Sequence, residues 1–327
     1  MHYHHNDWAF NAIGHSGVPG LAMGGDAVSD PPKFAGGGRG FRNRRPGQRM
    51  TETLVDTGFQ QIDVNGLTFR CRLDGREGAP WMVFSNSLLT NLSLWDAQVA
   101  AFGDRFRILR YDQRGHGGTA VPPGPASLDQ LTEDAAALMR HFGISGAIFV
   151  GVSMGAATAF YMAARHPDLV AAVVASDGQS RTAPGGAQAW QERIDFARQN
   201  GMPAFADATL KRWFSPAALA AQGPALPLVH EMVLNTPENG FVACAQALQS
   251  YDIHGALPGL RQPVLLIAGE KDGAMPKSMQ ELAGIIPDSS YVEIPGAGHL
   301  PCIEEPEAFN TAMRRFLDEK LAPAGRG

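Results

Sequence analysis

The 327-residue chain has few cysteines, no surplus of positive charge and no long apolar run. Its three cysteines, Cys71, Cys244 and Cys302, are scattered, and such an odd set without metal-ligand spacing forms neither a disulfide framework nor a zinc site. We therefore expect free thiols in a reducing, cytoplasmic compartment. The net charge of −5 argues against a nucleic-acid binder, and the absence of about 18 consecutive apolar residues argues against a transmembrane helix.

Residues 1–49 have no apolar periodicity. They are dominated by glycine, proline and charge, and such a segment cannot bury enough apolar surface to offset the entropy of ordering it. The apolar centre of a secretion signal is also missing. We expect a disordered tail, and because patterned sequence follows Met50 at once, we expect Met50 to be the natural start or residues 1–49 to be dispensable.

Short apolar runs alternate with helical patterns from Gln60 onward. Alternating residues on both sides of Asn65-Gly66 predict a β-hairpin. Helical periodicity covers residues 127–143, 153–167 and 306–321. Six further runs have the length and composition of buried parallel strands: 81–85, 106–111, 147–151, 170–176, 263–269 and 290–294. This order predicts an α/β fold, with a mainly parallel eight-stranded sheet and helices on both faces.

One stretch, residues 180–255, interrupts the alternation. It holds several short helical patterns and no convincing strand. We expect a helical cap inserted at 180–255, over a core formed by residues 50–179 and 256–327.

Ser153 lies in the sequence Gly-Val-Ser-Met-Gly, where a predicted strand passes into a predicted helix. A sharp turn at this point can present a serine as a nucleophile, and its crowding requires small neighbours such as Gly151 and Gly155. The amides at the start of the next helix favour a developing negative charge. We expect the amide of Met154 to be one oxyanion donor, and that of Leu88, after the strand 81–85, to be the other.

Two residues that could serve this serine follow later strands. Asp272 comes after the run 263–269 and His299 after 290–294, so the chain order is serine, aspartate, histidine, as in hydrolases with a nucleophile elbow. His299 would take the proton from Ser153, and Asp272 would orient the imidazole. Asp177, after 170–176, is an alternative for the acid position.

Other polar residues near these loops receive structural interpretations. Arg114 and His116 follow the strand 106–111, and we expect them to brace a loop. No cluster of metal ligands and no dinucleotide fingerprint is present, so we expect no cofactor.

The chain resembles the α/β-hydrolase superfamily from about Gly58 to Leu321, and within it most resembles the 3-oxoadipate enol-lactonases. The segments that carry the resemblance are "SNSLLTNLSLWDAQVAAF", "RILRYDQRGHGGT", "GVSMG", "GMPAFADATLKRWFSP" and "NTPENGFVACAQAL". Asn86-Ser87 resembles the lactonase form of a loop in which most relatives carry His-Gly. Ala156 stands where the family usually has glycine, and the segment after residue 176 differs from the family in composition.

The resemblance implies a serine hydrolase that opens a small enol-lactone through an acyl-enzyme. Asn86, Ser87 and Trp213 would contact the substrate, and Arg181 or Arg212 would hold its carboxylate. The same scaffold also serves hydrolases of other lactones, carboxylesterases, carbon–carbon bond hydrolases and receptors with slow turnover. We expect a small-molecule substrate, no nucleic-acid or membrane partner, and a monomer or homodimer.

Overall fold

The computed structural model describes residues 58–320. The tail predicted at residues 1–49, and the predicted start at Met50, lie outside the described residues. No helix among those described is long and apolar enough to cross a membrane.

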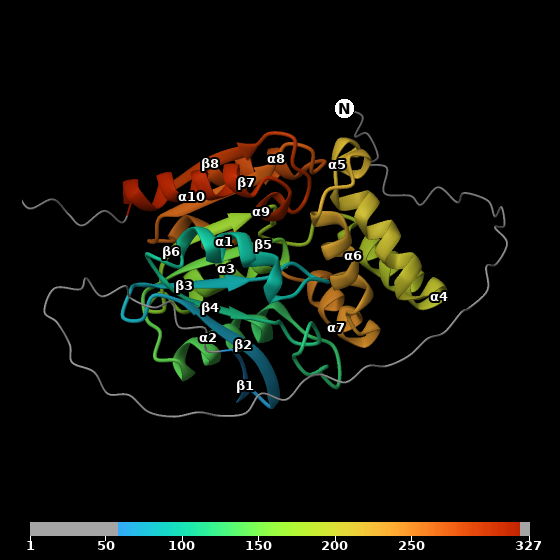
Figure 1. The fold of residues 1–327 in the computed structure, drawn as a ribbon, viewed down its shortest axis with the longest axis horizontal. Coiled ribbons are helices and arrows are strands. Elements are labelled where there is room, and N and C mark those ends of the chain that lie inside the picture. Colours follow the sequence, from blue (N-terminus) through green and yellow to red (C-terminus); the bar gives the residue numbers. More distant parts are fainter. Residues whose placement is uncertain (1–57, 321–327) are drawn as a thin grey trace, which may run out of the picture. The chain divides into compact units, whose positions relative to one another are not determined.

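One sheet of eight strands runs through the described residues, in the order β1-β2-β4-β3-β5-β6-β7-β8 (Figure 1). β2 pairs antiparallel with β1 and with β4, and the other neighbours are parallel. The predicted eight-stranded, mainly parallel sheet is confirmed. The strands are β1 (Phe59–Val64), β2 (Leu67–Gly75), β3 (Trp81–Ser85), β4 (Arg107–Tyr111), β5 (Ala147–Val152), β6 (Val170–Ser176), β7 (Val264–Gly269) and β8 (Ser289–Ile294).

The two antiparallel strands at one edge form the predicted hairpin. Asn65 and Gly66 connect β1 to β2, and both have a positive φ, 49° and 76°. Such a two-residue turn suits the twist of the strands, and asparagine followed by glycine adopts it readily. β4, β5 and β7 are buried along their whole length, as their continuous apolar runs predicted.

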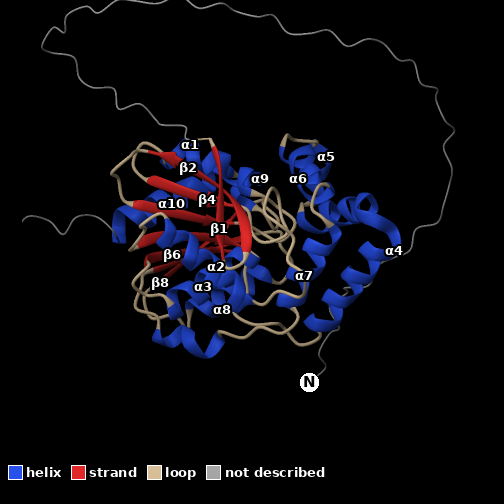
Figure 2. Ribbon diagram, turned by 90° about the horizontal axis from the view of Figure 1, so that it is seen from below, coloured by secondary structure: helices blue, strands red, loops and turns tan. Residues whose placement is uncertain are grey.

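Helices cover both faces of the sheet (Figure 2). On one face lie α1 (Asp96–Phe102) and α10 (Pro306–Lys320), and on the other lie α2 (Leu128–His141), α3 (Met154–Arg165) and α8 (Met275–Ala283). Ser127 begins α2 with a complete capping box, because its hydroxyl accepts from the Gln130 amide while the Gln130 side chain accepts from the Ser127 amide. Three shorter elements are η1 (Leu92–Trp95), η2 (His254–Gly259) and α9 (Pro301–Glu304).

A helical insertion lies between β6 and β7 (Figure 1). We use this name for α4 (Gly186–Trp213), α5 (Pro216–Ala221), α6 (Ala225–Leu234) and α7 (Glu238–Leu248). α4 bends at Gly201, whose φ of 78° and ψ of 164° are not helical, which is why the sequence shows two separate helical patterns there. The division into a core and a cap with boundaries at 180 and 255 stays a prediction.

The insertion contacts the loop after β4 through the main chains of two glycines. Gly115 and Gly240 face each other so closely that a Cβ atom on Gly240 would collide with the Gly115 carbonyl. In addition, the Thr236 hydroxyl lies 3.4 Å from the carbonyl oxygen of Leu89, in the loop after β3. These contacts seat α7 and the end of α6 against the loops at the carboxyl ends of the strands.

We predict that Gly240→Ala destabilises the protein by about 1–3 kcal/mol, because the added methyl group forces α7 away from the loop after β4. Urea unfolding measures the change. The control is Gly223→Ala, where an added Cβ atom meets no atom within 4 Å and φ is not positive. That variant should stay within about 1 kcal/mol of the parent protein. Equal stability of the two variants would contradict the close contact.

Candidate active site

Ser153 occupies a strained turn between β5 and α3. Its φ of 57° and ψ of −113° are unusual for a residue with a side chain, and its amide is fixed by a 2.8 Å hydrogen bond to the Ser176 carbonyl. A Cβ atom on Gly151 would collide with the Gly155 carbonyl, and one on Gly155 would collide with the Ser85 carbonyl. Both glycines are therefore required by the close approach of α3 to the sheet, as the sequence pattern predicts.

Asp272 and His299 come together at the ends of the neighbouring strands β7 and β8. The Nδ1 atom of His299 lies 2.7 Å from Oδ2 of Asp272, and both side chains are largely buried. A histidine that donates from Nδ1 to a carboxylate keeps Nε2 available to accept a proton. The ring of Trp213 lies 5.4 Å from the imidazole, centre to centre, so an indole covers part of the pair.

Three successive amides hold the loop that carries His299. Oε2 and Oε1 of Glu304 accept from the amides of Gly298 and Leu300, at 3.0 and 3.1 Å. The His299 amide donates to the Trp213 carbonyl at 2.7 Å, and a Cβ atom on Gly298 would collide with the same carbonyl. Burial raises the pKa of Glu304, while these amides and the charge of His299 act in the opposite direction. Sequence reasoning missed Glu304. Only its position in the short helix that begins at Pro301 could have pointed to it.

The loop after β3 lies beside the Ser153 turn because β3 and β5 are paired, with Ser85 opposite Gly151. Among the described residues, neither the Leu88 amide nor the Met154 amide has a hydrogen-bond acceptor. Their assignment as oxyanion donors stays a prediction.

Asn86 and Ser87 differ in their partners. The Asn86 side chain donates to the Tyr111 carbonyl at 2.8 Å and accepts from the Trp95 indole at 2.9 Å, so both of its polar ends hold the loop. Gln113, which sequence reasoning missed, adds a 3.0 Å bond to the Asn86 carbonyl. Ser87 is 1% exposed, and its hydroxyl has no hydrogen-bond partner among the described residues. Buried polar groups are nearly always paired, so this hydroxyl is an exception in the loop after β3.

Asp177, the alternative acid, bonds to other groups. Its two oxygens accept from the Gly269 amide at 2.8 Å and from the Ser176 hydroxyl at 2.6 Å. The carboxyl that lies against His299 in this structure is that of Asp272.

Two arginines of α4 lie close enough to interact, and Arg193 also interacts with Asp272. Burial lowers the pKa of Arg212, which directly precedes Trp213. Burial and the charge of Arg212 lower the pKa of Arg193, whereas Asp272 raises it, and a guanidinium keeps its charge at neutral pH. The Arg193 guanidinium also lies 4.2 Å from the ring centre of Trp190. Sequence reasoning named Arg212 but missed Arg193. Arg181 is exposed, and its backbone pairs with Asp252.

The loop after β4 is braced by charge. Nε and Nη2 of Arg114 donate to the Asp134 carboxylate of α2 at 2.6 and 2.8 Å, and Nδ1 of His116 lies 3.0 Å from the Arg114 carbonyl. Burial lowers the pKa of His116, so its imidazole is neutral near pH 7. Arg114 thus ties the loop after β4 to α2, and His116 bonds within that loop.

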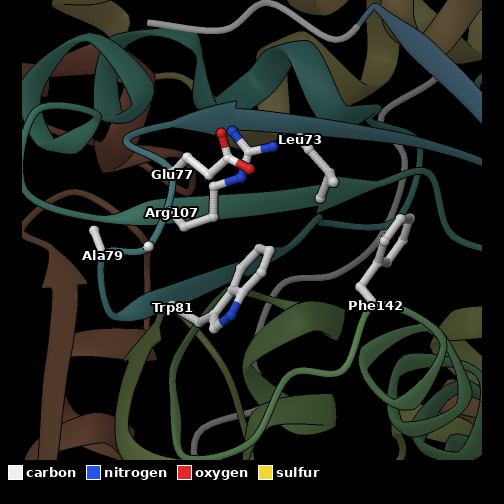
Figure 3. Close-up of a pocket in the computed structure, with 7 residues that line it drawn as sticks. Leu73, Glu77, Ala79, Trp81, Arg107 and Phe142 are labelled. Atoms are coloured by element: carbon white, nitrogen blue, oxygen red, sulfur yellow. The ribbon is translucent and has the colours of Figure 1, made fainter. Parts of the chain in front are cut away.

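A cavity of about 320 Å³ lies at the other edge of the sheet (Figure 3). Trp81 and Arg107 begin β3 and β4, so this cavity is at the amino ends of strands whose carboxyl ends carry the site. It is therefore separate from Ser153 and His299. Its lining residues are Leu73, Glu77, Gly78, Ala79, Trp81, Arg107 and Phe142.

Two further findings concern ligand chemistry. Within residues 58–320 no three His, Cys, Asp or Glu side chains gather into a group that could hold a metal ion. Cys71, Cys244 and Cys302 are buried and free, and burial raises the pKa of the Cys71 and Cys244 thiols to about 12.

The sheet, the strained serine turn and the carboxylate–imidazole pair are those of an α/β hydrolase. Residues 80–306 match the family described as alpha/beta hydrolase fold, and the chain belongs to it.

Similar proteins include enol-lactonases. The chain is 34% identical to 3-oxoadipate enol-lactonase 2 of Acinetobacter baylyi over 262 residues, which are 79% of this chain and 95% of that protein. A solved enol-lactonase from Burkholderia xenovorans is 38% identical, with a TM-score of 0.75 over 79% of this chain and 99% of the other. A solved thermophilic esterase from Thermogutta terrifontis is 27% identical, with a TM-score of 0.73 over 82% and 98% of the two chains.

We predict that Glu304→Gln destabilises the protein by about 1–3 kcal/mol, because an amide has one oxygen and leaves either Gly298 or Leu300 without an acceptor. Unfolding in urea measures the change. Glu305→Gln, at an exposed neighbour, is the matched control and should be neutral. An unchanged midpoint for Glu304→Gln would remove Glu304 from the set of residues that hold the His299 loop.

Proposed function

We propose that this protein is a serine hydrolase that opens a small enol-lactone through an acyl-enzyme, and that it acts in the cytoplasm. The observation that carries the proposal is the 2.7 Å contact between His299 and Asp272 on the sheet edge where Ser153 occupies its strained turn.

In the proposed mechanism Ser153 attacks the ring carbonyl while Nε2 of His299 takes the hydroxyl proton. Asp272 holds Nδ1 of His299 and stabilises the imidazolium that forms. The amides of Leu88 and Met154 bind the tetrahedral oxyanion. Ring opening releases an enolate, which takes a proton and tautomerises to the ketone. Water activated by His299 then attacks the acyl-Ser153 ester and frees the acid.

Two observations support a lactone as substrate. The relatives named enol-lactonase align over nearly their whole length, at 34% and 38% identity. The unpartnered hydroxyl of Ser87 stands beside the proposed oxyanion donor Leu88, where it could bind a ring or carboxylate oxygen.

The electrostatics of α4 support a substrate with a carboxylate. Arg193 and Arg212 repel each other in a largely buried setting, and Arg193 also interacts with Asp272. A carboxylate beside these two guanidinium groups would form charge-assisted hydrogen bonds with them.

A second candidate is a carboxylesterase, favoured by the 27% identity to the Thermogutta terrifontis esterase over 82% of this chain. The proposed chemistry on Ser153 is the same for both candidates, so only the substrate distinguishes them.

We predict that the protein turns over 3-oxoadipate enol-lactone with a higher kcat/KM than a simple aryl ester such as p-nitrophenyl acetate. Ser153→Ala should lower kcat by about 10³-fold or more, because no other group supplies the nucleophile. Ser145→Ala, at an exposed serine before β5, is the control and should be fully active. Hydrolysis that survives in Ser153→Ala would overturn the assignment, and turnover of the ester alone would favour the carboxylesterase.

We predict that Arg193→Gln and Arg212→Gln each lower kcat/KM for the carboxylated enol-lactone by about 10- to 100-fold, the equivalent of a charge-assisted hydrogen bond. Neither should matter for the methyl ester of the same lactone, because it has no anion to bind. Arg181→Gln is the control at an exposed arginine. A loss that is equal for the acid and its ester, or one confined to Arg181→Gln, would contradict the role of the α4 pair.

A further inference from the structure

We propose that Asp177 is a positioning residue, a carboxyl that stays protonated and donates a hydrogen bond to the Asp272 carboxylate, so that Asp272 is aligned on His299. This inference rests on the proposed function of the Asp272–His299 pair. In this arrangement Asp272 carries the negative charge and Asp177 carries a proton, so the two carboxyl groups together hold one proton.

The backbone fixes where the two carboxyls meet. β6 and β7 are neighbours with parallel register, and the Asp177 amide donates to the Ile267 carbonyl at 2.9 Å. Gly269 then joins both acids, because its amide donates to Oδ1 of Asp177 at 2.8 Å while its carbonyl accepts from the Asp272 amide at 3.0 Å. The Asp272 side chain acts on Asp177 both through its charge and as a hydrogen-bonding neighbour.

The surroundings of Asp177 favour its neutral form. The residue is 1% exposed, and the two groups that donate to it, the Ser176 hydroxyl and the Gly269 amide, are both uncharged. Burial, followed by the charge of Asp272, raises the pKa of Asp177 well above its ordinary value of 3.8. Two touching carboxylates resist ionising together, and the partner that faces an imidazole keeps the negative charge. Asp272 is that partner.

The groups around the two acids reinforce this distribution of charge. Arg193 is the cation that α4 brings toward the pair, and it acts on Asp272. From the remaining elements, the titratable groups that interact with Asp177 or Asp272 are His299 and Glu304 in the segment after β8, Tyr291 of β8 and Cys302 of α9. Within residues 58–320 the donors to Asp177 are the uncharged Ser176 hydroxyl and Gly269 amide, and no cationic side chain bonds to it.

The backbone conformation of Asp177 is itself unusual. Its φ of 47° lies in the left-handed region, which aspartate and asparagine tolerate better than most residues with a side chain. The next residue must be small, because a Cβ atom on Gly178 would come within 2.5 Å of the Ala156 methyl group. The turn after β6 therefore holds a buried acid at a fixed point beside Asp272.

The protonation state of Asp177 affects how Asp272 is oriented. While Asp177 keeps its proton, one hydrogen bond orients the Asp272 carboxylate that His299 contacts. When Asp177 ionises at high pH, a second negative charge stands beside Asp272 and that hydrogen bond is lost. The alkaline limb of the kcat profile thus contains the ionisation of Asp177.

The first test is kinetic and uses Asp177→Asn, which keeps the shape, the left-handed preference and a donor toward Asp272. We expect kcat within about threefold of the parent near neutral pH, and an alkaline limb displaced upward or lost. Asp272→Asn, in comparison, should lose activity at every pH, as expected for a change in the charged acid. A loss in Asp177→Asn as large as in Asp272→Asn, or an unaltered pH profile, would overturn the proposal.

The second test needs no activity. A folded state that keeps a proton which the unfolded chain has released loses stability as pH rises, by about tenfold in the folding constant per pH unit between the unfolded and folded pKa values. Asp177→Asn should remove this dependence, matching the parent near pH 4 and becoming more stable than it toward neutral pH. The control is Asp168→Asn, at an exposed aspartate. Parallel stability profiles for the parent and Asp177→Asn would refute a protonated Asp177.

The two tests separate the two proposals. If Ser153→Ala and Asp272→Asn leave hydrolysis intact, the proposed function fails, while the stability profile still reports whether Asp177 carries a proton. If those variants are inactive and the stability profile is unaltered, Asp177 alone has been assigned wrongly.

Discussion

The parallel pairing of β3, β5, β6, β7 and β8 brings Ser153, Asp272, His299 and the loop after β3 to one edge of the sheet. At this edge backbone approaches backbone without side chains between. Gly155 faces the Ser85 carbonyl, Gly269 faces the Gly298 carbonyl, and Gly298 faces the Trp213 carbonyl. Distances between loops that are far apart in sequence are therefore set by van der Waals contact of main chains, which side-chain rotation cannot relax.

The sequence allowed the sheet and much of the candidate site to be predicted, because both depend on strong local patterns. The buried strands are continuous apolar runs, and Ser153, Asp272 and His299 each follow one of them directly. Short elements such as α1 and α9 were missed because 7 and 4 residues are too few to display a helical period. Chain order favoured Asp272 over Asp177 for the acid position but left Asp177 open, since both follow strands and only the three-dimensional structure shows which carboxyl meets His299.

A departure from the family has a structural explanation. Ala156 stands where the family usually has glycine, and its methyl group points at the place where Gly178 lacks a side chain. The volume added on α3 is thus matched by volume missing from the turn after β6. The contact between the two positions contributes to the packing that seats Asp177.

The bend at Gly201 divides α4 into two halves that are held by different hydrogen bonds. The last residue of the second half, Trp213, accepts the hydrogen bond from the His299 amide. Any outward swing of that half would break this bond and displace the imidazole. The first half is held elsewhere, because the Gln249 side chain donates to the Ala187 carbonyl at 3.1 Å and to Oε1 of Gln191 at 3.3 Å. A displacement of the insertion therefore reaches the imidazole of His299 through the second half of α4.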